Sequence, residues 1–228
     1  MSIKNINIIK LIRKVNPWKT LYINFHYFPF KTAIKTPIYV YWRTELKELG
    51  GNIILPSTIW RGMLHLGVNK VGTLDSFYSR TILELSGTIK VLGTASIGRG
   101  SKISVGNNAT LTLGKGFMIT GNTQIICRKE IVFGEYNLLS WDILIMDSDL
   151  HNILDHHNEI VNRPKSIHFG NHVWIGCRTT ILKGVTIPDN SIISACSTIS
   201  RSFESQNCII GGHGKSGEII KHDINWKV

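Results

Sequence analysis

A large apolar residue recurs at every sixth position over two long stretches of the chain. One run is Phe169, Ile175, Ile181, Ile187, Ile193 and Ile199, and another is Leu113, Ile119, Ile125 and Ile131. A period of six matches neither the turn of an α-helix nor the simple alternation of a strand. It is typical of a chain that turns a corner every six residues and keeps its aliphatic side chains inside. The sequence therefore predicts an all-β solenoid, a triangular stack of parallel strands with one continuous core.

The period holds from about residue 83 to 145 and again from 167 to 200, enough for roughly five coils of about 18 residues each. The intervening segment, about 146–166, reads MDSDLHNILDHHNEIVNRPKS and has no apolar period. Because a polar segment cannot form the wall of the prism, we expect it to leave the coil as an excursion. Long excursions from rigid scaffolds commonly carry functional residues.

The chain before residue 81 lacks the period and is expected to form a basic, aromatic extension. Residues 3–15 have a loosely amphipathic helical pattern that ends at Asn16-Pro17. Residues 18–34 are expected to continue as an aromatic helix interrupted at Pro29, and 37–80 as short strands that lead into the first coil. The predicted organisation is thus a helical and mixed extension over 1–80, a β-helix domain over 81–205 and a tail over 206–228.

The formal net charge of +11 is concentrated near the N-terminus. Residues 1–50 hold nine Lys and Arg against two Glu, which is +7, and aromatic residues are interleaved with them. Such a segment could bind anionic lipid headgroups or a phosphate-bearing substrate, or it could pack on the core with its charges solvated. No nucleic-acid-binding motif accompanies the charge, so nucleic acid is not an expected partner.

The remaining composition favours a cytoplasmic location. The first residues carry basic side chains throughout and lack the apolar run of a signal peptide. No apolar stretch approaches the roughly 20 residues of a spanning helix. Cysteines are scattered, without a C-x-x-C pair, which argues against a zinc ribbon or a disulfide framework; they are Cys127, Cys177, Cys196 and Cys208.

The segment NHVWIGCRTTILKGVTIPDNSIISACSTISRSF resembles the hexapeptide-repeat acyltransferase family. Upstream, SWDILIMDSDLHNI resembles the segment that bears the catalytic histidine in sugar O-acetyltransferases of that family. The similarity covers about residues 83–217. It implies a left-handed parallel β-helix, a homotrimer with active sites between subunits, and transfer of an acetyl group from acetyl-CoA to a saccharide hydroxyl. A capsule, O-antigen or exopolysaccharide precursor, free or as a glycolipid, is the expected acceptor.

The resemblance assigns the general base to His151. An alcohol is a poor nucleophile at neutral pH, and imidazole, with an ordinary pKa near 6.5, is suited to removing its proton. Asp147, Asp149 and His151 alternate by two, so in an extended chain they would point to one side. We expect Asp149 to orient the imidazole and Asp147 to contact substrate. Asp142 lies close to an acceptor-binding asparagine of the family and is a further substrate-binding candidate.

The resemblance also implies a coenzyme A groove along the last coils. The matching positions are Trp174, Cys177, Ala195, Ser200, Arg201 and Lys215. Arg201 and Lys215 are suitable partners for the cofactor phosphates. Direct transfer needs no acyl-enzyme, so Cys177 is interpreted as a small groove residue and not as a nucleophile. Departures from the family pattern are Ser194 and Cys196 in place of glycines, Pro188 in place of another glycine, and His213 where proline is usual.

Other functions remain open at this stage. The main alternative is an N-acetyltransferase acting on an amino sugar or an antibiotic. A γ-class carbonic anhydrase shares the predicted prism, but its paired histidine spacing is occupied here by Cys177 and Leu182, so no metal site is predicted. A purely structural β-helix would show a regular ladder of threonines on one face, which is missing. The basic N-terminal segment suggests peripheral contact with the inner face of an anionic membrane.

Overall fold

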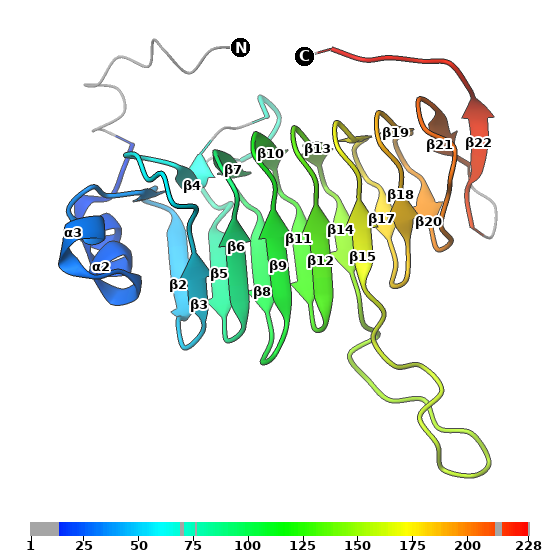
Figure 1. Ribbon diagram of the computed structural model, residues 1–228, viewed down its shortest axis with the longest axis horizontal. Helices are drawn as coiled ribbons and strands as arrows, with labels where there is room; N and C mark the ends of the chain where they lie inside the picture. Colours follow the sequence, from blue (N-terminus) through cyan, green and yellow to red (C-terminus); the bar gives the residue numbers. More distant parts are fainter. Residues whose placement is uncertain (1–13, 69–70, 76, 213–215, 228) are drawn as a thin grey trace.

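The computed structural model describes residues 14–68, 71–75, 77–212 and 216–227. Within them the chain winds through three sheets that form the sides of a prism (Figure 1). From β1 to β20 every third strand joins the same sheet, β21 and β22 extend the sheet of β19, and all neighbouring strands are parallel except β21 and β22. The expected stack of parallel strands around one core is therefore present.

We call the sheets 1, 2 and 3 in the order in which the chain visits them. Sheet 1 contains β1 (Ile38–Val40), β4 (Leu64–Val68), β7 (Ala95–Gly98), β10 (Phe117–Gly121), β13 (Leu138–Trp141), β16 (Trp174–Ile175), β19 (Ile192–Ile193), β21 (Ile209–Gly211) and β22 (Glu218–Lys221). Sheet 2 contains β2 (Thr44–Glu48), β5 (Thr81–Leu85), β8 (Lys102–Val105), β11 (Gln124–Cys127), β14 (Leu144–Met146), β17 (Thr180–Ile181) and β20 (Thr198–Ile199). Sheet 3 contains β3 (Asn52–Ile54), β6 (Thr88–Val91), β9 (Thr110–Leu113), β12 (Glu130–Phe133), β15 (Ile167–Phe169) and β18 (Thr186–Ile187).

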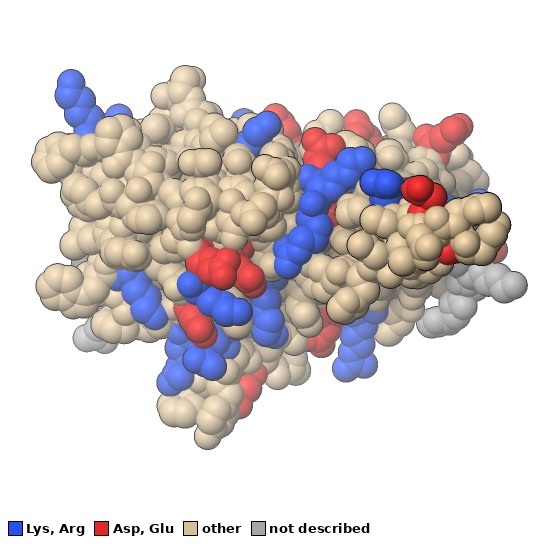
Figure 2. Space-filling view, turned by 90° about the horizontal axis from the view of Figure 1, so that it is seen from below, with Lys and Arg blue, Asp and Glu red and all other residues tan. Residues whose placement is uncertain are grey.

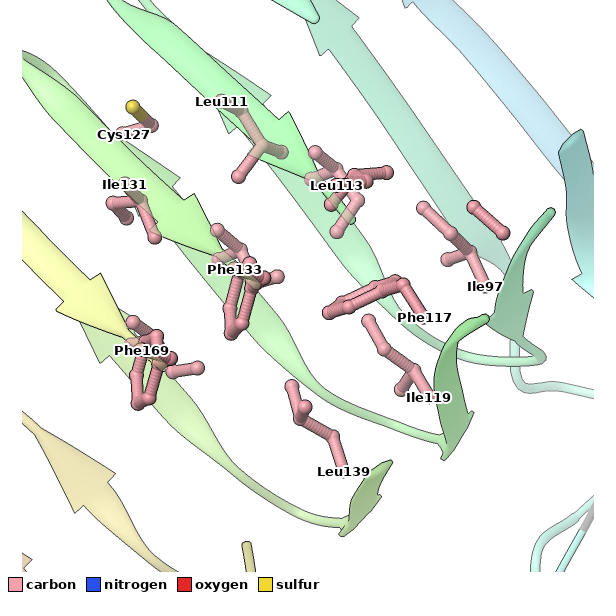
Figure 3. Packing of buried hydrophobic residues seen from close by; sticks show 14 of the residues in the cluster. Ile97, Leu111, Leu113, Phe117, Ile119, Cys127, Ile131, Phe133, Leu139 and Phe169 are labelled. Carbon is pink, nitrogen blue, oxygen red and sulfur yellow. The ribbon is translucent and has the colours of Figure 1, made fainter. Parts of the chain in front are cut away.

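The periodic apolar residues fill the prism. Ile119, Ile125 and Ile131 are fully buried, one from each sheet of the same coil. Aromatic rings continue the column along the axis (Figure 3): the ring centroids of Phe117 and Phe133 lie 4.7 Å apart, and Phe133 stacks on Phe169 at 4.6 Å. Each coil thus covers the apolar side chains of the next, which is the main source of stability in a solenoid.

The corners of the prism are also repeated from coil to coil. At the 1–2 corner, where the chain passes from sheet 1 to sheet 2, a left-handed backbone conformation recurs at Gly100, Asn122, Asp142, Arg178 and Cys196. Asparagine, aspartate and glycine adopt this conformation most readily, whereas arginine and cysteine adopt it rarely. The repeat keeps every coil in register with its neighbours.

The stack begins earlier than the expected boundary at residue 81. Strands β1, β2 and β3 already pair in parallel with β4, β5 and β6, with Ile38 opposite Leu64 and Asn52 opposite Thr88. These first coils have connections of unequal length, so their inward residues do not recur at a strict spacing of six. At the other end, β21 continues sheet 1 beyond residue 205 and the antiparallel β22 follows it.

Two helices cover the open end of the first coil (Figure 1): α2 (Pro17–Tyr27) and the short α3 (Phe30–Ala33). Asn16 caps α2 by accepting a hydrogen bond from the Lys19 N–H, and Pro17 follows at the first helical position. Thr20 and Asn24 bond to the main chain of β1, and so satisfy an edge strand that would otherwise be unpaired.

The interruption expected at Pro29 is present, because the break between α2 and α3 falls there. The helix expected over 3–15 falls almost wholly outside the described residues. No helix in the described part of the chain is both long enough and apolar enough to traverse a bilayer.

Candidate functional site

The excursion leaves the prism at the 2–3 corner of the fifth coil. Strand β14 ends at Met146 and β15 begins at Ile167, and the connecting residues project well away from the stack (Figure 1). Inside this segment the main chains of Leu154 and Ile160 form an antiparallel bridge, and the Val161 N–H donates to the Ile153 carbonyl at 2.9 Å. The excursion is therefore a folded hairpin-like arm with its own hydrogen bonds.

His151 lies at the base of this arm and is exposed. The Asn162 amide nitrogen donates to the His151 carbonyl at 2.8 Å and also to the Asp149 carboxylate at 2.8 Å. Lys183, from the coil below, donates to the same carboxylate and, at 2.9 Å, to the Asn162 carbonyl. These contacts tie the main chain at His151 to the rigid prism and leave its side chain accessible.

Asp149 is engaged by Lys183 and Asn162, and no hydrogen bond to the His151 ring is among the contacts of the described residues. Hydrogen bonds from Lys183 and Asn162 hold the pKa of Asp149 below its ordinary value. Asp147, Asp149 and His151 do not share one side, because the chain bends here and Leu150 has a φ of 65°. The extended geometry assumed from the sequence is therefore not present, and the side-chain partners of the Asp149 carboxylate in the structure are Asn162 and Lys183.

Asp147, expected to contact substrate, is instead completely buried. Its carboxylate accepts the backbone N–H groups of Arg128, Lys129 and Glu130 at 2.7–2.8 Å. The Cys127 thiol lies 3.7 Å away, and burial, together with this carboxylate, raises the pKa of that thiol. Asp147 therefore links the turn between β11 and β12 to the base of the arm through hydrogen bonds, and its buried carboxylate is not accessible to substrate.

Asp142 lies at the 1–2 corner, the other end of sheet 2. Its exposed carboxylate accepts a hydrogen bond from the Asn122 amide and lies 4.0 Å from Arg178 Nε. The step from Asp142 to Asp147 spans roughly 16 Å of extended chain at about 3.3 Å per residue. Asp142 and His151 of the same chain are thus held at opposite edges of one sheet.

The residues expected to bind coenzyme A are distributed around sheet 2 in coils six and seven. Cys177 and Ala195 stack at the 1–2 corner, where the Cys196 N–H donates to the Cys177 carbonyl at 2.9 Å. Ser200 and Arg201 follow β20 at the 2–3 corner, the corner from which the arm emerges. Lys215 lies outside the described residues.

Trp174 differs from this group because it lies on sheet 1. Its indole N–H donates to Ser140 Oγ at 3.1 Å, and its ring lies 6.0 Å from that of Trp226 in the C-terminal segment. Trp226 in turn stacks on His172, with centroids 4.0 Å apart, and donates to the His172 carbonyl. The tail thus folds back over the outer face of coil six.

Lys183 and Asn162 belong to the site although the sequence did not indicate them. Lys183 is 34 residues from Asp149, and Asn162 is 13 residues away, so only the fold brings them together. Figure 2 views the molecule from the side on which the arm projects, and basic side chains are spread over this face together with acidic ones. Arg128, at the 2–3 corner between β11 and β12, donates to Ser104 Oγ at 3.0 Å.

The arm contains several histidines and aspartates, which are residue types that can bind a metal ion. The rings of His156 and His157 lie 3.8 Å apart near its tip. Across residues 14–68, 71–75, 77–212 and 216–227, no three His, Cys, Asp or Glu side chains are grouped as a metal ion would require.

Residues 166–201 match the family model described as bacterial transferase hexapeptide (six repeats). Among curated proteins, the chain is 28% identical over 138 residues to the polysialic acid O-acetyltransferase of Escherichia coli O1:K1 / APEC, covering 60% of this chain and 42% of that protein. It is 31% identical over 102 residues to the galactoside O-acetyltransferase of Escherichia coli K12, covering 44% and 48%. The chain therefore spans less than half the length of these curated relatives.

Among solved structures, the polySia-specific acetyltransferase NeuO superposes with a TM-score of 0.51 and 21% identity, covering 81% of this chain and 72% of that one. This likeness establishes the fold. The chain is a left-handed parallel β-helix protein, as expected from its sequence. Residues 166–201 carry the hexapeptide repeat of bacterial transferases, so the resemblance expected over about residues 83–217 is confirmed for this part.

Proposed function

We propose that this protein transfers an acetyl group from acetyl-CoA to a hydroxyl of a saccharide, with His151 as general base. The observation that carries the proposal is an exposed histidine held at the base of a folded arm, directly beside the coils that match the transferase repeat. Relatives named as O-acetyltransferases of polysialic acid and of galactosides support the same reaction class.

In the proposed reaction the acceptor oxygen attacks the thioester carbonyl carbon. A C–O bond forms, the C–S bond breaks, and the hydroxyl proton passes to His151 and then to the departing thiolate. Asn162 and Lys183 hold the main chain at His151, so the imidazole approaches from a fixed base and little entropy is lost at the moment of reaction.

The outer face of sheet 2 in coils six and seven suits an extended thiol cofactor. Its side chains are small or medium sized, as at Thr180 and Thr198, and Cys177 and Ala195 border it. Arg201 lies at the 2–3 corner, at the other edge of sheet 2 from Cys177 and Ala195. Its Nε donates to the Gly217 carbonyl at 3.1 Å, and its guanidinium lies over the Phe203 ring at 4.8 Å. A cation fixed in this way is suited to a phosphate group.

The test is thiol release from acetyl-CoA across a panel of saccharides and amino sugars, including oligosialic acid and galactosides. We expect release that depends on a saccharide, and mass spectrometry of the product should locate the acetyl group on oxygen. An acetyl group on nitrogen would favour the amino-sugar alternative. Thiol release with none of the acceptors above the rate in water would contradict the proposal.

We further propose that the active form is a homotrimer. Asp142 and His151 occupy opposite edges of sheet 2, so a ring of prisms would bring the acceptor edge of one subunit to the histidine edge of the next. The arm also exposes apolar side chains that a neighbouring subunit would cover; they are Leu150, Ile153, Leu154 and Val161, each 52–59% exposed.

Sedimentation at assay concentration should therefore give the mass of three chains of 25.6 kDa each. The double substitution Leu154→Ser with Val161→Ser should shift the mass towards one chain, because it removes apolar contact area from the arm. Leu92→Ser is the matched control, since Leu92 is equally exposed, at 56%, but lies outside the arm. A monomeric mass for the unaltered protein would contradict the proposed assembly.

We also propose that the protein works at the inner face of the membrane on a surface-polysaccharide precursor. The support is the basic N-terminal segment, of which residues 1–13 lie outside the described residues, together with the polymeric acceptor named for one relative. Polybasic segments gain about 1 kcal/mol per Lys or Arg near anionic lipid. Cosedimentation with anionic but not neutral vesicles, weakening with salt, is the expected behaviour.

A further inference from the structure

A cleft of about 600 Å³ lies at the end of the prism away from the proposed transfer site. Helix α2, the first 1–2 corner, strand β2 and the residue before β5 border this open cleft. Its lining residues are Lys19, Tyr22, Trp42, Arg43, Thr44, Glu45, Leu46 and Arg80. None of them is part of the acetyl-transfer machinery proposed above, and the volume is that of a typical small-molecule site.

One wall of the cleft is aromatic. Tyr22 and Trp42 are 58% and 53% exposed, and the Tyr22 ring stacks on His26 with centroids 5.8 Å apart. Large aromatic side chains exposed inside a concavity, and not scattered singly, mark binding surfaces. The negative face of an aromatic ring attracts the positively polarised C–H groups that a sugar ring presents on its flat side. This wall is therefore suited to a carbohydrate.

The cleft is also lined by cations that are held in place by contacts. Lys19 Nζ donates to the Thr44 carbonyl at 2.6 Å, and the Arg43 guanidinium covers the Phe77 ring at 4.1 Å. Arg80 Nη1 lies 3.3 Å from the Glu45 carboxylate. Three cations and one carboxylate thus line the cleft, and with Asp75, which lies near Arg43, the local charge is still positive. Arginine matches a carboxylate or phosphate with two parallel N–H donors, and Glu45 can accept from sugar hydroxyls.

The cleft shares an edge of the prism with the candidate acceptor residue Asp142. Arg43 is at the 1–2 corner of the first coil, and Asp142 is at the same corner four coils later. At the strand spacing of about 4.8 Å this separation is roughly 19 Å along the edge. Arg99 and Arg178 lie at this corner in other coils, so the edge carries further positive charge. A saccharide chain of several residues would reach from one position to the other.

We propose that this cleft binds an anionic sugar residue, bearing a carboxylate or phosphate, of a long acceptor chain whose distant part is acetylated. The inference rests on the proposed acetyltransferase function. The cleft is concave, and Glu45 lies inside it. A lipid headgroup layer is flat and phospholipid tails carry no hydroxyls for Glu45 to accept from, so the shape of the cleft and its mixture of cations with one carboxylate favour a saccharide.

The experiment compares the full chain with Trp42→Ala and with Arg43→Gln. The acceptors are oligosaccharides of sialic acid and of galacturonic acid, each as disaccharide and octasaccharide, with carboxyl-reduced octasaccharides as neutral probes. One of the two anionic octasaccharides will be acetylated faster than the other by the unaltered chain. For that octasaccharide, both variants should raise KM about tenfold and leave kcat within twofold, because they weaken binding of the acceptor in the cleft and do not change the acetyl-transfer step. KM for the disaccharides should not change, and the neutral probes should bind weakly to all forms.

Tyr136→Ala is the matched control, because Tyr136 is 50% exposed and has Lys115 over its ring at 5.8 Å, but lies outside the cleft. It should behave like the unaltered chain. Calorimetric measurement of octasaccharide binding without acetyl-CoA tests the cleft separately from the proposed acetyltransferase function. If octasaccharide binding depends on Trp42 and Arg43 but the protein acetylates none of the acceptors, the result would contradict the proposed acetyltransferase function and support saccharide binding in the cleft.

Three outcomes would overturn the proposal. In the first, KM for both anionic octasaccharides is the same in Trp42→Ala as in the unaltered chain. In the second, disaccharides and octasaccharides are affected equally, which would indicate a general structural effect. In the third, the variants lose salt-sensitive binding to vesicles of anionic phospholipid while their affinity for the octasaccharides is unchanged, which would assign the cleft to lipid.

Discussion

Replacing His151 with alanine should lower kcat by two to four orders of magnitude, the usual contribution of a general base. The physical reason is that the acceptor hydroxyl would have to lose its proton to water, because the neighbouring Asp149 carboxylate is already engaged by Lys183 and Asn162. KM for acetyl-CoA should change little, because the residues proposed to bind the cofactor are on coils six and seven. Steady-state kinetics with both substrates varied is the measurement.

The arm supplies its own controls. His156 and His157 lie farther out in the same arm, so His156→Ala and His157→Ala should retain turnover within a few-fold of the unaltered chain. Lys183→Ala should lower kcat by less than His151→Ala, because it releases the base of the arm without removing the imidazole. Near-normal turnover in His151→Ala would remove the proposed mechanism.

Replacing Asp147 with alanine should destabilise the fold by about 3–5 kcal/mol, because a fully buried carboxylate that accepts three backbone N–H groups is lost. The donors are the backbone groups of Arg128, Lys129 and Glu130. At about 2–4 °C per kcal/mol for a chain of this size, Tm should fall by roughly 6–20 °C. Calorimetry or circular dichroism measures the change in Tm. The Tm of Asp147→Asn, which keeps one acceptor oxygen, should lie between those of Asp147→Ala and the unaltered chain.

Asp142→Ala is the matched control for this substitution. It also removes an aspartate at a corner next to β14, but that carboxylate is exposed and bonds to side chains only, so Tm should change little. If Asp147 contacted substrate, as its position beside His151 suggested, alanine there would leave Tm unchanged and raise KM for the acceptor. An unchanged Tm together with a raised KM would contradict the structural role assigned to the buried Asp147 carboxylate.

The fold was largely predictable from the later coils. From Trp174 to Ile199 the strands are two residues long and the corners nearly identical, so one inward residue recurs at every sixth position, as at Ile175, Ile181 and Ile187. The first two coils were not predicted from the sequence, because the connections between their strands are longer and unequal. Leu64 and Ile97 point into the same core, but the insertion before β5 hides the repeat that joins them.

The candidate site was less predictable than the fold. His151 was identified because a family motif places it, and the arm was expected because its residues lack an apolar period. The role of Asp147 could not be inferred, because alternation by two predicts a shared face only while the chain stays extended. Here the chain turns out of sheet 2 at that residue, so Asp147 points inward and Asp149 meets Lys183.

By itself, the sequence determined the solenoid, the point at which the arm leaves it and the histidine the arm carries, because periodicity and local motifs are properties of consecutive residues. Only the tertiary structure decided which carboxylate is buried, which lysine anchors the arm, and that Lys19, Trp42 and Arg80 enclose one cleft. Those contacts join residues far apart in the chain. They exist because coils stack at a fixed spacing, which places corners from different coils side by side.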